Sequence, residues 1–232
     1  MKELKQNEVL NSIKKANESG VRKRTFKTGK PNDECYTSMQ DIMDELFYWS
    51  KKGKFEGKNI ICPCDWNILG DVNDNKNVYS ITISYSDNGV DVLGNYVKKA
   101  AVQISLFDEE NKPTKIDIKE NEIDDFLRNE LVCNFVRVLT QNARKWGIKS
   151  ITMSGYNPAL GRGIKFQDID YSKYDLVITN PPFSLMKEFT KKIIEESNSN
   201  GHHLDFIFLA PFLNRVTPGL GVYLMLKKAF LG

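Results

Sequence analysis

The sequence predicts an α/β fold in which a mostly parallel sheet is covered by helices on both faces. Short apolar runs typical of buried strands alternate with longer segments of helical periodicity, the pattern of parallel strands joined by crossover helices. The chain has 232 residues, 41% hydrophobic and 27% charged, so it can build a sizeable core. It contains no apolar run of about 18 residues, the length of a membrane span. We therefore expect no membrane partner.

Residues 1–32 are predicted to form an N-terminal helix followed by a basic arm. Residues 3–18 carry apolar side chains at helical spacing, whereas residues 20–34 have almost none. The candidate DNA-binding cations of this arm are Arg22, Lys23, Arg24 and Lys27. Two interpretations stay open, a solvated linker or a flexible arm that contacts phosphates.

The α/β part begins with a helix and a buried strand. Thr37 and Gln40 fit a capping box at the start of a helix that continues to about Lys51. Residues 58–63 then read as a buried strand.

Residues 71–120 are predicted to be a β-rich insertion. Residues 78–85 alternate between apolar and polar side chains, and Ser-Asp-Asn-Gly at 86–89 is a hairpin turn signal. Residues 100–107 and 115–118 are expected to add further short strands.

The α/β alternation then resumes. We expect one long helix over residues 122–146, ended by Gly147 in the position after the last turn. Strands are expected at residues 149–156, 174–179 and 204–210, with a helix at residues 184–197 between the last two. Open sheets of this kind bind ligands at the carboxyl ends of their strands.

Charge and cysteine usage limit the class of protein. The formal net charge of +3 allows a nucleic-acid partner without requiring one. Four cysteines in a chain too large to need disulfides favour a reducing compartment, so a cytoplasmic location is expected. Cys62 and Cys64 are interpreted as small buried hydrophobes. His202 and His203 lack a ligand cluster, so no metal site is predicted.

Asn180-Pro181-Pro182-Phe183 is the predicted catalytic motif, because it directly follows the strand at 174–179. The Asn180 side-chain oxygen and the Pro181 carbonyl can accept both hydrogens of a planar amine and free its lone pair. The prolines fix two φ angles, so the acceptors are preorganised. Phe183 offers a face on which an extruded base can stack. The alternative is a Pro-Pro turn that ends a strand, with Phe183 in the core.

Four segments, in this order, resemble the EcoRI-type adenine-specific DNA methyltransferases. They are DECYT (33–37), IICPCD (60–65), CNFVRVLTQNARKWGIKSITMSGYNP (133–158) and FQDIDYSKYDLVITNPPFS (166–184). The resemblance implies that residues 33–232 form a Rossmann-like methyltransferase catalytic domain that binds S-adenosylmethionine. It also implies methyl transfer to the exocyclic amine of a flipped adenine in double-stranded DNA. The cofactor-binding residues it implies are Tyr36, Thr37, Asp65, Tyr156 and Asp168.

Each implied cofactor residue has a structural alternative. Tyr36 and Tyr156 could pack in the core, Asp65 could cap a turn, and Asp168 could be a surface acid. The loop after residue 65 also departs from the glycine-rich pattern of most methyltransferases, and no acid marks the ribose contact.

The carboxyl end and the partners complete the expectations. The sequence stops soon after the fifth predicted strand, so we expect a C-terminal target-recognition part to be missing or truncated. Competing hypotheses are a truncated, inactive nucleic-acid-binding protein and a methyltransferase for RNA adenine or protein glutamine. A monomer is expected, with a cognate restriction nuclease or a phage genome as its biological context.

Overall fold

A computed structural model of the chain describes residues 39–66, 76–98, 113–158, 161–198 and 204–208. Several predictions lie outside these residues, including the basic arm, the capping box and the strand at 100–107. The site candidates outside them are Arg22, Lys23, Arg24, Lys27, Tyr36 and Thr37.

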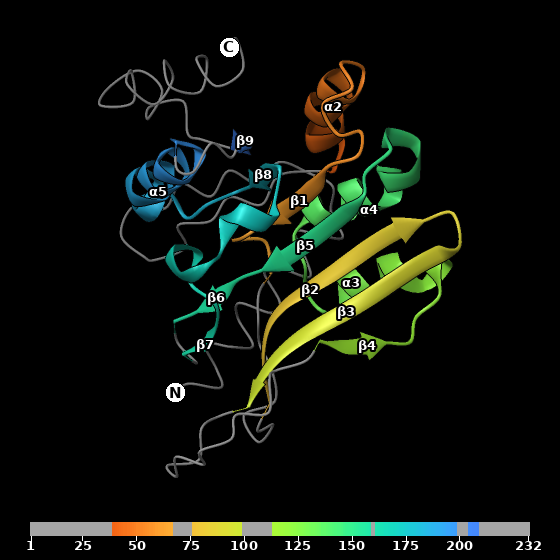
Figure 1. Cartoon of the computed structure of the whole chain (residues 1–232), viewed down its shortest axis with the longest axis horizontal. Helices are drawn as coiled ribbons and strands as arrows, with labels where there is room; N and C mark the ends of the chain where they lie inside the picture. Colours follow the sequence, from red (N-terminus) through yellow and green to blue (C-terminus); the bar gives the residue numbers. More distant parts are fainter. Residues whose placement is uncertain (1–38, 67–75, 99–112, 159–160, 199–203, 209–232) are drawn as a thin grey trace.

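The described residues form one large mixed sheet. Its strand order is β4-β3-β2-β5-β1-β8-β9 (Figure 1). The strands are β1 Asn59–Cys62, β2 Lys76–Ser86, β3 Gly89–Lys98, β4 Thr114–Ile116, β5 Ser150–Ser154, β8 Leu176–Thr179 and β9 Asp205–Phe208. A separate two-stranded sheet pairs β6 Tyr156–Asn157 with β7 Arg162–Gly163.

One half of the large sheet is parallel, as the alternation of strands and helices predicts. β1 pairs in parallel with β5 on one side and β8 on the other, and β8 pairs in parallel with β9. Ile60 of β1 lies level with both Ile151 and Leu176, so apolar residues fill the middle of this half. The carboxyl ends of these four strands therefore share one edge of the sheet.

The other half is antiparallel and continues the same sheet. β2 and β3 form the predicted hairpin, and Gly89 after its two-residue turn has a φ of 133°. β2 also pairs antiparallel with β5, where the hydroxyl groups of Thr82 and Thr152 lie 2.9 Å apart. The β-rich stretch thus widens the central sheet.

Helices lie beside the sheet close to their predicted positions, with one correction. The α-helices are α2 Met39–Ser50, α3 Ile123–Asn129, α4 Asn134–Trp146 and α5 Met186–Asn198. Short 3₁₀ helices are η1 Glu120–Glu122, η2 Phe166–Asp168, η3 Tyr171–Lys173 and η4 Phe183–Leu185. The prediction of a single helix over residues 122–146 is wrong, because the helix is interrupted between α3 and α4.

No glycine or proline marks this interruption in the sequence, and its cause is a contact with a distant segment of the chain. Leu131 takes a left-handed conformation with a φ of 57°. The backbone N–H of Cys133 donates to the carbonyl of Asp65 at 2.7 Å. A contact far away in sequence thus replaces the helical hydrogen bond. The predicted end of the second helix is confirmed, since Gly147 is left-handed with φ 66°.

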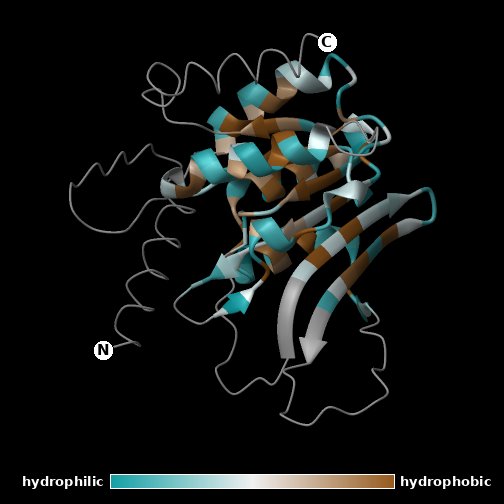
Figure 2. Ribbon diagram, turned by 60° about the vertical axis from the view of Figure 1, so that its left-hand side comes forward, coloured by the Kyte–Doolittle hydropathy of each residue, from teal (hydrophilic) through white to brown (hydrophobic). Residues whose placement is uncertain are grey.

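Two hydrophobic cores cover the two faces of the sheet. Alternate strand residues supply them: Ile60 joins the core built with α2, α3 and α4, and Ile61 joins the core built with α5. In Figure 2 brown, apolar residues colour the central strands and parts of the helices beside them. The predicted layering, with helices on both faces, is confirmed. Among the described helices, none has the length and apolar character needed to span a bilayer.

Candidate active site

The ends of β1 and β8 bring Asp65 and Asn180 together. These strands are parallel neighbours, so the loops after them meet at the same edge of the sheet. The backbone N–H of Asn180 donates to Oδ1 of Asp65 at 3.4 Å. Both residues are buried, with 2% and 8% of their surfaces exposed. The residue predicted from the proline motif and the acid implied by the family resemblance thus lie in contact.

The Asp65 carboxyl has an unusual electrostatic environment. Burial raises the pKa of Asp65 to about 6, against the lowering influence of the Thr179 hydroxyl, the Cys133 thiol and the Asn180 N–H. Oδ2 of Asp65 and Oγ1 of Thr179 make no hydrogen bond of ordinary geometry within the described part of the chain. The hydroxyl is therefore near enough to act on the charge without being bonded to it. Asp65 retains an acceptor oxygen for a ligand.

The proline motif forms a fixed turn between β8 and α5. Pro181 is buried, and Pro182 is half-buried. The N–H of Leu185 donates to the Pro182 carbonyl at 3.0 Å, which closes the turn of η4. The side chain of Phe183 lies outside the described residues, so its stacking role stays a prediction.

Tyr156 and Asp168 lie on the outside of the fold. Tyr156 is 39% exposed in β6, with the Lys165 ammonium 5.4 Å above its ring. Asp168 is exposed at the end of η2. Within the described residues no hydrogen bond links either of them to Asp65. Their roles toward a cofactor remain predictions.

Trp66, Cys133, Gly155 and Thr179 belong to this site and were not assigned a role from the sequence. Thr179 is fully buried beside Asp65 at the end of β8. Cys133 contributes the N–H that binds the Asp65 carbonyl. Gly155 offers the only usable sequence signal, because a glycine at the end of a strand marks the close approach of another backbone.

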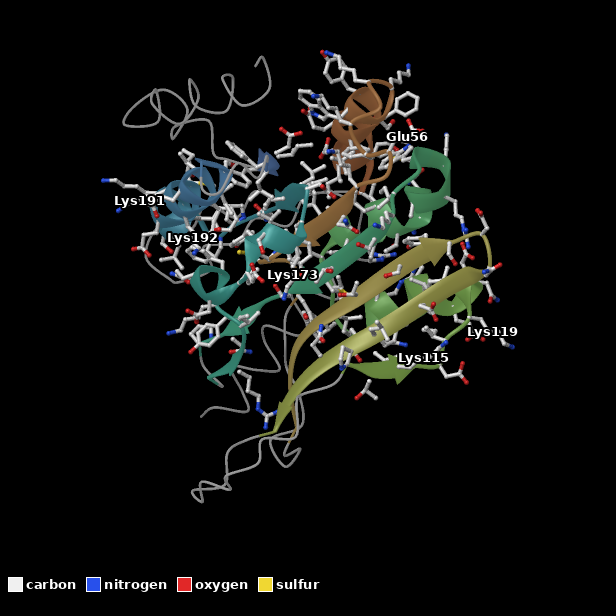
Figure 3. All side chains as sticks on the ribbon, viewed as in Figure 1. Glu56, Lys115, Lys119, Lys173, Lys191 and Lys192 are labelled. Atoms are coloured by element: carbon white, nitrogen blue, oxygen red, sulfur yellow. The ribbon has the colours of Figure 1, made fainter. Side chains whose placement is uncertain are left out.

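Cysteines and charged groups elsewhere in the described part of the chain form no cluster suited to a metal ion. Cys62 is fully buried, and burial raises the pKa of its thiol, which agrees with its interpretation as a small hydrophobe. Among the residues that the structure describes, no group of His, Cys, Asp and Glu side chains could hold a metal ion. Lys191 and Lys192 lie on α5 (Figure 3), and they form ion pairs with Glu195 and Glu196 one turn further along the helix.

Comparison with known proteins gives one match. A family model described as adenine-specific methyltransferase EcoRI matches residues 24–200. That range is more than half of the chain and includes Asp65, Gly155 and Asn180. No curated protein and no solved structure matches.

Proposed function

Because the chain belongs to the family of the adenine-specific methyltransferase EcoRI, we propose that it transfers a methyl group from S-adenosylmethionine to the exocyclic amine of adenine in DNA. The observation that carries this proposal is the buried contact between Asn180 and Asp65 at the carboxyl edge of the parallel strands. It joins an amine-binding motif to an acid suited to a cationic cofactor. The four parallel strands that hold the site support a Rossmann-like core.

Asn180 and Pro181 supply the acceptors that the reaction needs. The lone pair of an adenine amine is delocalised into its ring, so the nitrogen is a poor nucleophile. The side-chain oxygen of Asn180 and the carbonyl of Pro181 accept the two amine hydrogens, which favours a tetrahedral nitrogen. The hydrogen bond from the Asn180 N–H to Asp65 and the closed turn after Pro182 hold these acceptors in place. A duplex adenine reaches them only after it leaves the base stack.

The residues at this edge fit S-adenosylmethionine. Its methionine end carries an ammonium group, and the buried Oδ2 of Asp65 is an acceptor with no hydrogen bond among the described residues. An ammonium at this oxygen would satisfy a buried polar atom and favour the ionised carboxyl. When bound, the cofactor supplies an electrophilic methyl group. We propose Tyr36, Thr37, Tyr156 and Asp168 as further cofactor contacts.

The substrate is proposed to be DNA because of the family's described activity. The proposed phosphate contacts are the cations of the basic arm, Arg22, Lys23, Arg24 and Lys27. RNA adenine and protein glutamine offer a similar planar NH₂ group. The methyl-transfer assay described next distinguishes these substrates from DNA.

The test compares wild type with Asn180→Ala. Calorimetry measures binding of S-adenosylmethionine, and tritiated cofactor measures methyl transfer to unmethylated DNA, RNA and protein. We expect Asn180→Ala to lower transfer about 100- to 1000-fold, because one acceptor aimed at the developing charge is lost. Cofactor affinity should change by less than about threefold, since the backbone N–H that binds Asp65 remains.

Ser184→Ala is the matched control, because it truncates an exposed polar side chain at the end of the same motif. It should leave both measurements unchanged. Turnover retained in Asn180→Ala would refute the proposed role of this residue. Label found only in RNA or protein would show that this molecule, and not DNA, is the substrate.

A further inference from the structure

Trp66 follows Asp65 directly and is tied to the junction between α3 and α4. Its indole Nε1–H donates to the carbonyl of Glu130 at 3.0 Å, and its backbone forms an antiparallel bridge with Val132. Trp66 is 5% exposed and belongs to the core built with α2, α3 and α4. The backbone N–H of Cys133 also donates to the Asp65 carbonyl, so this junction contacts both Asp65 and Trp66.

The junction adopts a disfavoured backbone to make these contacts. Leu131 is the one non-glycine residue with positive φ among those that the structure describes. A left-handed conformation brings Cβ close to the following carbonyl, so it persists where surrounding contacts impose it. Those contacts are the Glu130 and Val132 interactions with Trp66 on either side of Leu131.

Gly155, directly after β5, lies close against the backbone of Trp66. A Cβ added at Gly155 would lie 2.0 Å from the carbonyl oxygen of Trp66. The end of β5 can therefore pass this close only without a side chain. The backbone of Trp66 thus contacts both the α3–α4 junction and the end of β5.

We propose that Trp66 is a positioning residue that fixes the Asp65 carboxyl at the edge of the sheet for a cationic group of the ligand. This inference rests on the proposed function, because the cationic group is the ammonium of S-adenosylmethionine. The anchor would keep Asp65 buried beside Asn180, where Oδ2, an acceptor without an ordinary hydrogen bond among the described residues, remains able to accept from the ammonium. A loosened Trp66 would let the carboxyl turn toward water.

The test uses Trp66→Phe, with Trp146→Phe as its matched control. Both tryptophans are buried in the same core, but Nε1 of Trp146 has no hydrogen-bond partner among the described residues. Trp66→Phe should raise the dissociation constant of S-adenosylmethionine about tenfold, the effect of one lost hydrogen bond. Its kcat at saturating cofactor should be unchanged, because the substitution weakens cofactor binding equally in the ground state and the transition state. Trp146→Phe should stay within about twofold of wild type.

A second readout needs no cofactor. Carboxyl ¹³C NMR follows the ionisation of Asp65, with Asp65→Asn used to assign the signal. The wild-type pKa should lie at about 6. In Trp66→Phe it should fall toward the ordinary value, because the carboxyl gains water. The thiols of Cys62 and Cys133 face Asp65, and burial raises the pKa of both, so neither changes charge in this range.

The outcomes separate this inference from the proposed function. If the wild type does not bind S-adenosylmethionine, the proposed function fails, and the NMR titration still decides the role of Trp66. An unchanged Asp65 pKa in Trp66→Phe overturns the positioning role. If that variant does not fold, Gly155→Ala gives the same test, because its Cβ displaces the Trp66 peptide without altering the indole.

Discussion

Asp65 combines a buried position with a charge that the proposed chemistry needs. Its pKa of about 6 leaves it ionised in most molecules at pH 7. Burial disfavours that charge, so an ammonium placed at Oδ2 would be strongly preferred over a neutral ligand. The same residue should make cofactor binding depend on pH.

We predict that affinity for S-adenosylmethionine weakens about tenfold per pH unit below pH 6, because protonated Asp65 no longer attracts the ammonium. Between pH 6.5 and 7.5, roughly one pKa unit above that midpoint, the affinity should be nearly constant. Calorimetry from pH 4.5 to 7.5, about one and a half units to either side of the midpoint, measures the profile.

Asp65→Asn is the control for this profile. It should bind the cofactor weakly and without the acid slope. Because the folded pKa of about 6 exceeds the ordinary 3.8, the folded protein keeps a proton that the unfolded chain releases. Asp65 therefore lowers stability as pH rises through this window. The ligand-free variant should be more stable than wild type at pH 7, by up to about 3 kcal/mol. A flat affinity profile in the wild type would contradict the role of Asp65.

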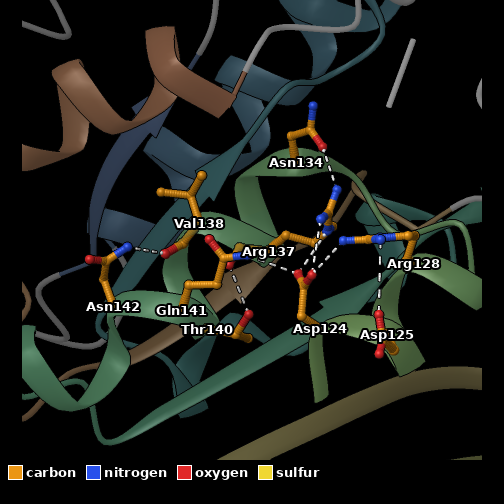
Figure 4. A network of polar contacts seen from close by, with 9 residues as sticks. All are labelled: Asp124, Asp125, Arg128, Asn134, Arg137, Val138, Thr140, Gln141 and Asn142. Atoms are coloured by element: carbon orange, nitrogen blue, oxygen red, sulfur yellow. Dashed lines mark hydrogen bonds and ion pairs between the residues drawn. The ribbon is translucent and has the colours of Figure 1, made fainter. Parts of the chain in front are cut away.

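α3 and α4 are joined by a partly buried ion pair. Arg137 donates from Nε and Nη2 to the two carboxyl oxygens of Asp124 at 2.9 and 3.1 Å (Figure 4). Gln141 and Arg128 bond to the same carboxyl. Only 4% of the Arg137 side chain is exposed, so the helix pair depends on this carboxylate.

We predict that Asp124→Ala lowers the free energy of unfolding by about 2–4 kcal/mol, since it leaves a buried guanidinium without its carboxylate. Asp124→Leu combined with Arg137→Met should cost less, because no buried charge remains. Urea unfolding of both variants measures the difference. An equal loss in the single and double variants would show that the charge itself is unimportant.

The Asp124–Arg137 ion pair makes the stability of these helices depend on pH in the acid range. Burial acts to raise the pKa of Asp124, but the Arg137, Gln141 and Arg128 contacts outweigh it and lower the pKa below 3.8. The pair therefore stabilises the fold above that value, and its contribution is lost as pH falls through the lower folded pKa.

Local sequence patterns predict most elements of the parallel half. β1, β8 and β9 are mostly apolar runs of strand length, β5 alternates polar and apolar residues, and Gly147 ends α4 where the C′ rule places it. The break at Leu131 could not be predicted, because residues 123–146 keep helical periodicity and the cause lies at Asp65 and Trp66. Contacts between segments distant in sequence override local preference at this point.

The candidate site shows the same division. The position of Asn180 after a buried strand follows from its motif, and the partner acid follows from the family resemblance. The contacts of Trp66 with Glu130, Val132 and Gly155 could not be predicted, since they depend on which strand ends and helix junctions meet. Alternation likewise predicts the hairpin of β2 and β3, but not its pairing with β5.

For the molecule as a whole, the two cores share one sheet and should unfold together. Leu139 of α4 belongs to one core and Phe189 of α5 to the other, and both are fully buried. Phe189 stacks edge-on against Phe166 and Phe208 at 5.0 and 4.8 Å. Neighbouring residues of β1 and β8 enter opposite cores, so neither face can loosen without the other.

We predict that Leu139→Ala and Phe189→Ala each lower the free energy of unfolding by about 2–5 kcal/mol, as large cavities in packed cores do. Each variant should still unfold in one transition. Circular dichroism in urea follows the loss of secondary structure, and tryptophan fluorescence follows the loss of packing around the tryptophans. Two separate transitions would contradict the coupling through the shared sheet.

The most direct test of the central claim is nucleoside mass spectrometry after incubation of the chain and S-adenosylmethionine with unmethylated DNA. The account predicts N6-methyladenine in the DNA with wild type and Ser184→Ala, and none above background with Asn180→Ala. Unmodified DNA after incubation with a folded, cofactor-binding wild-type chain would contradict the account.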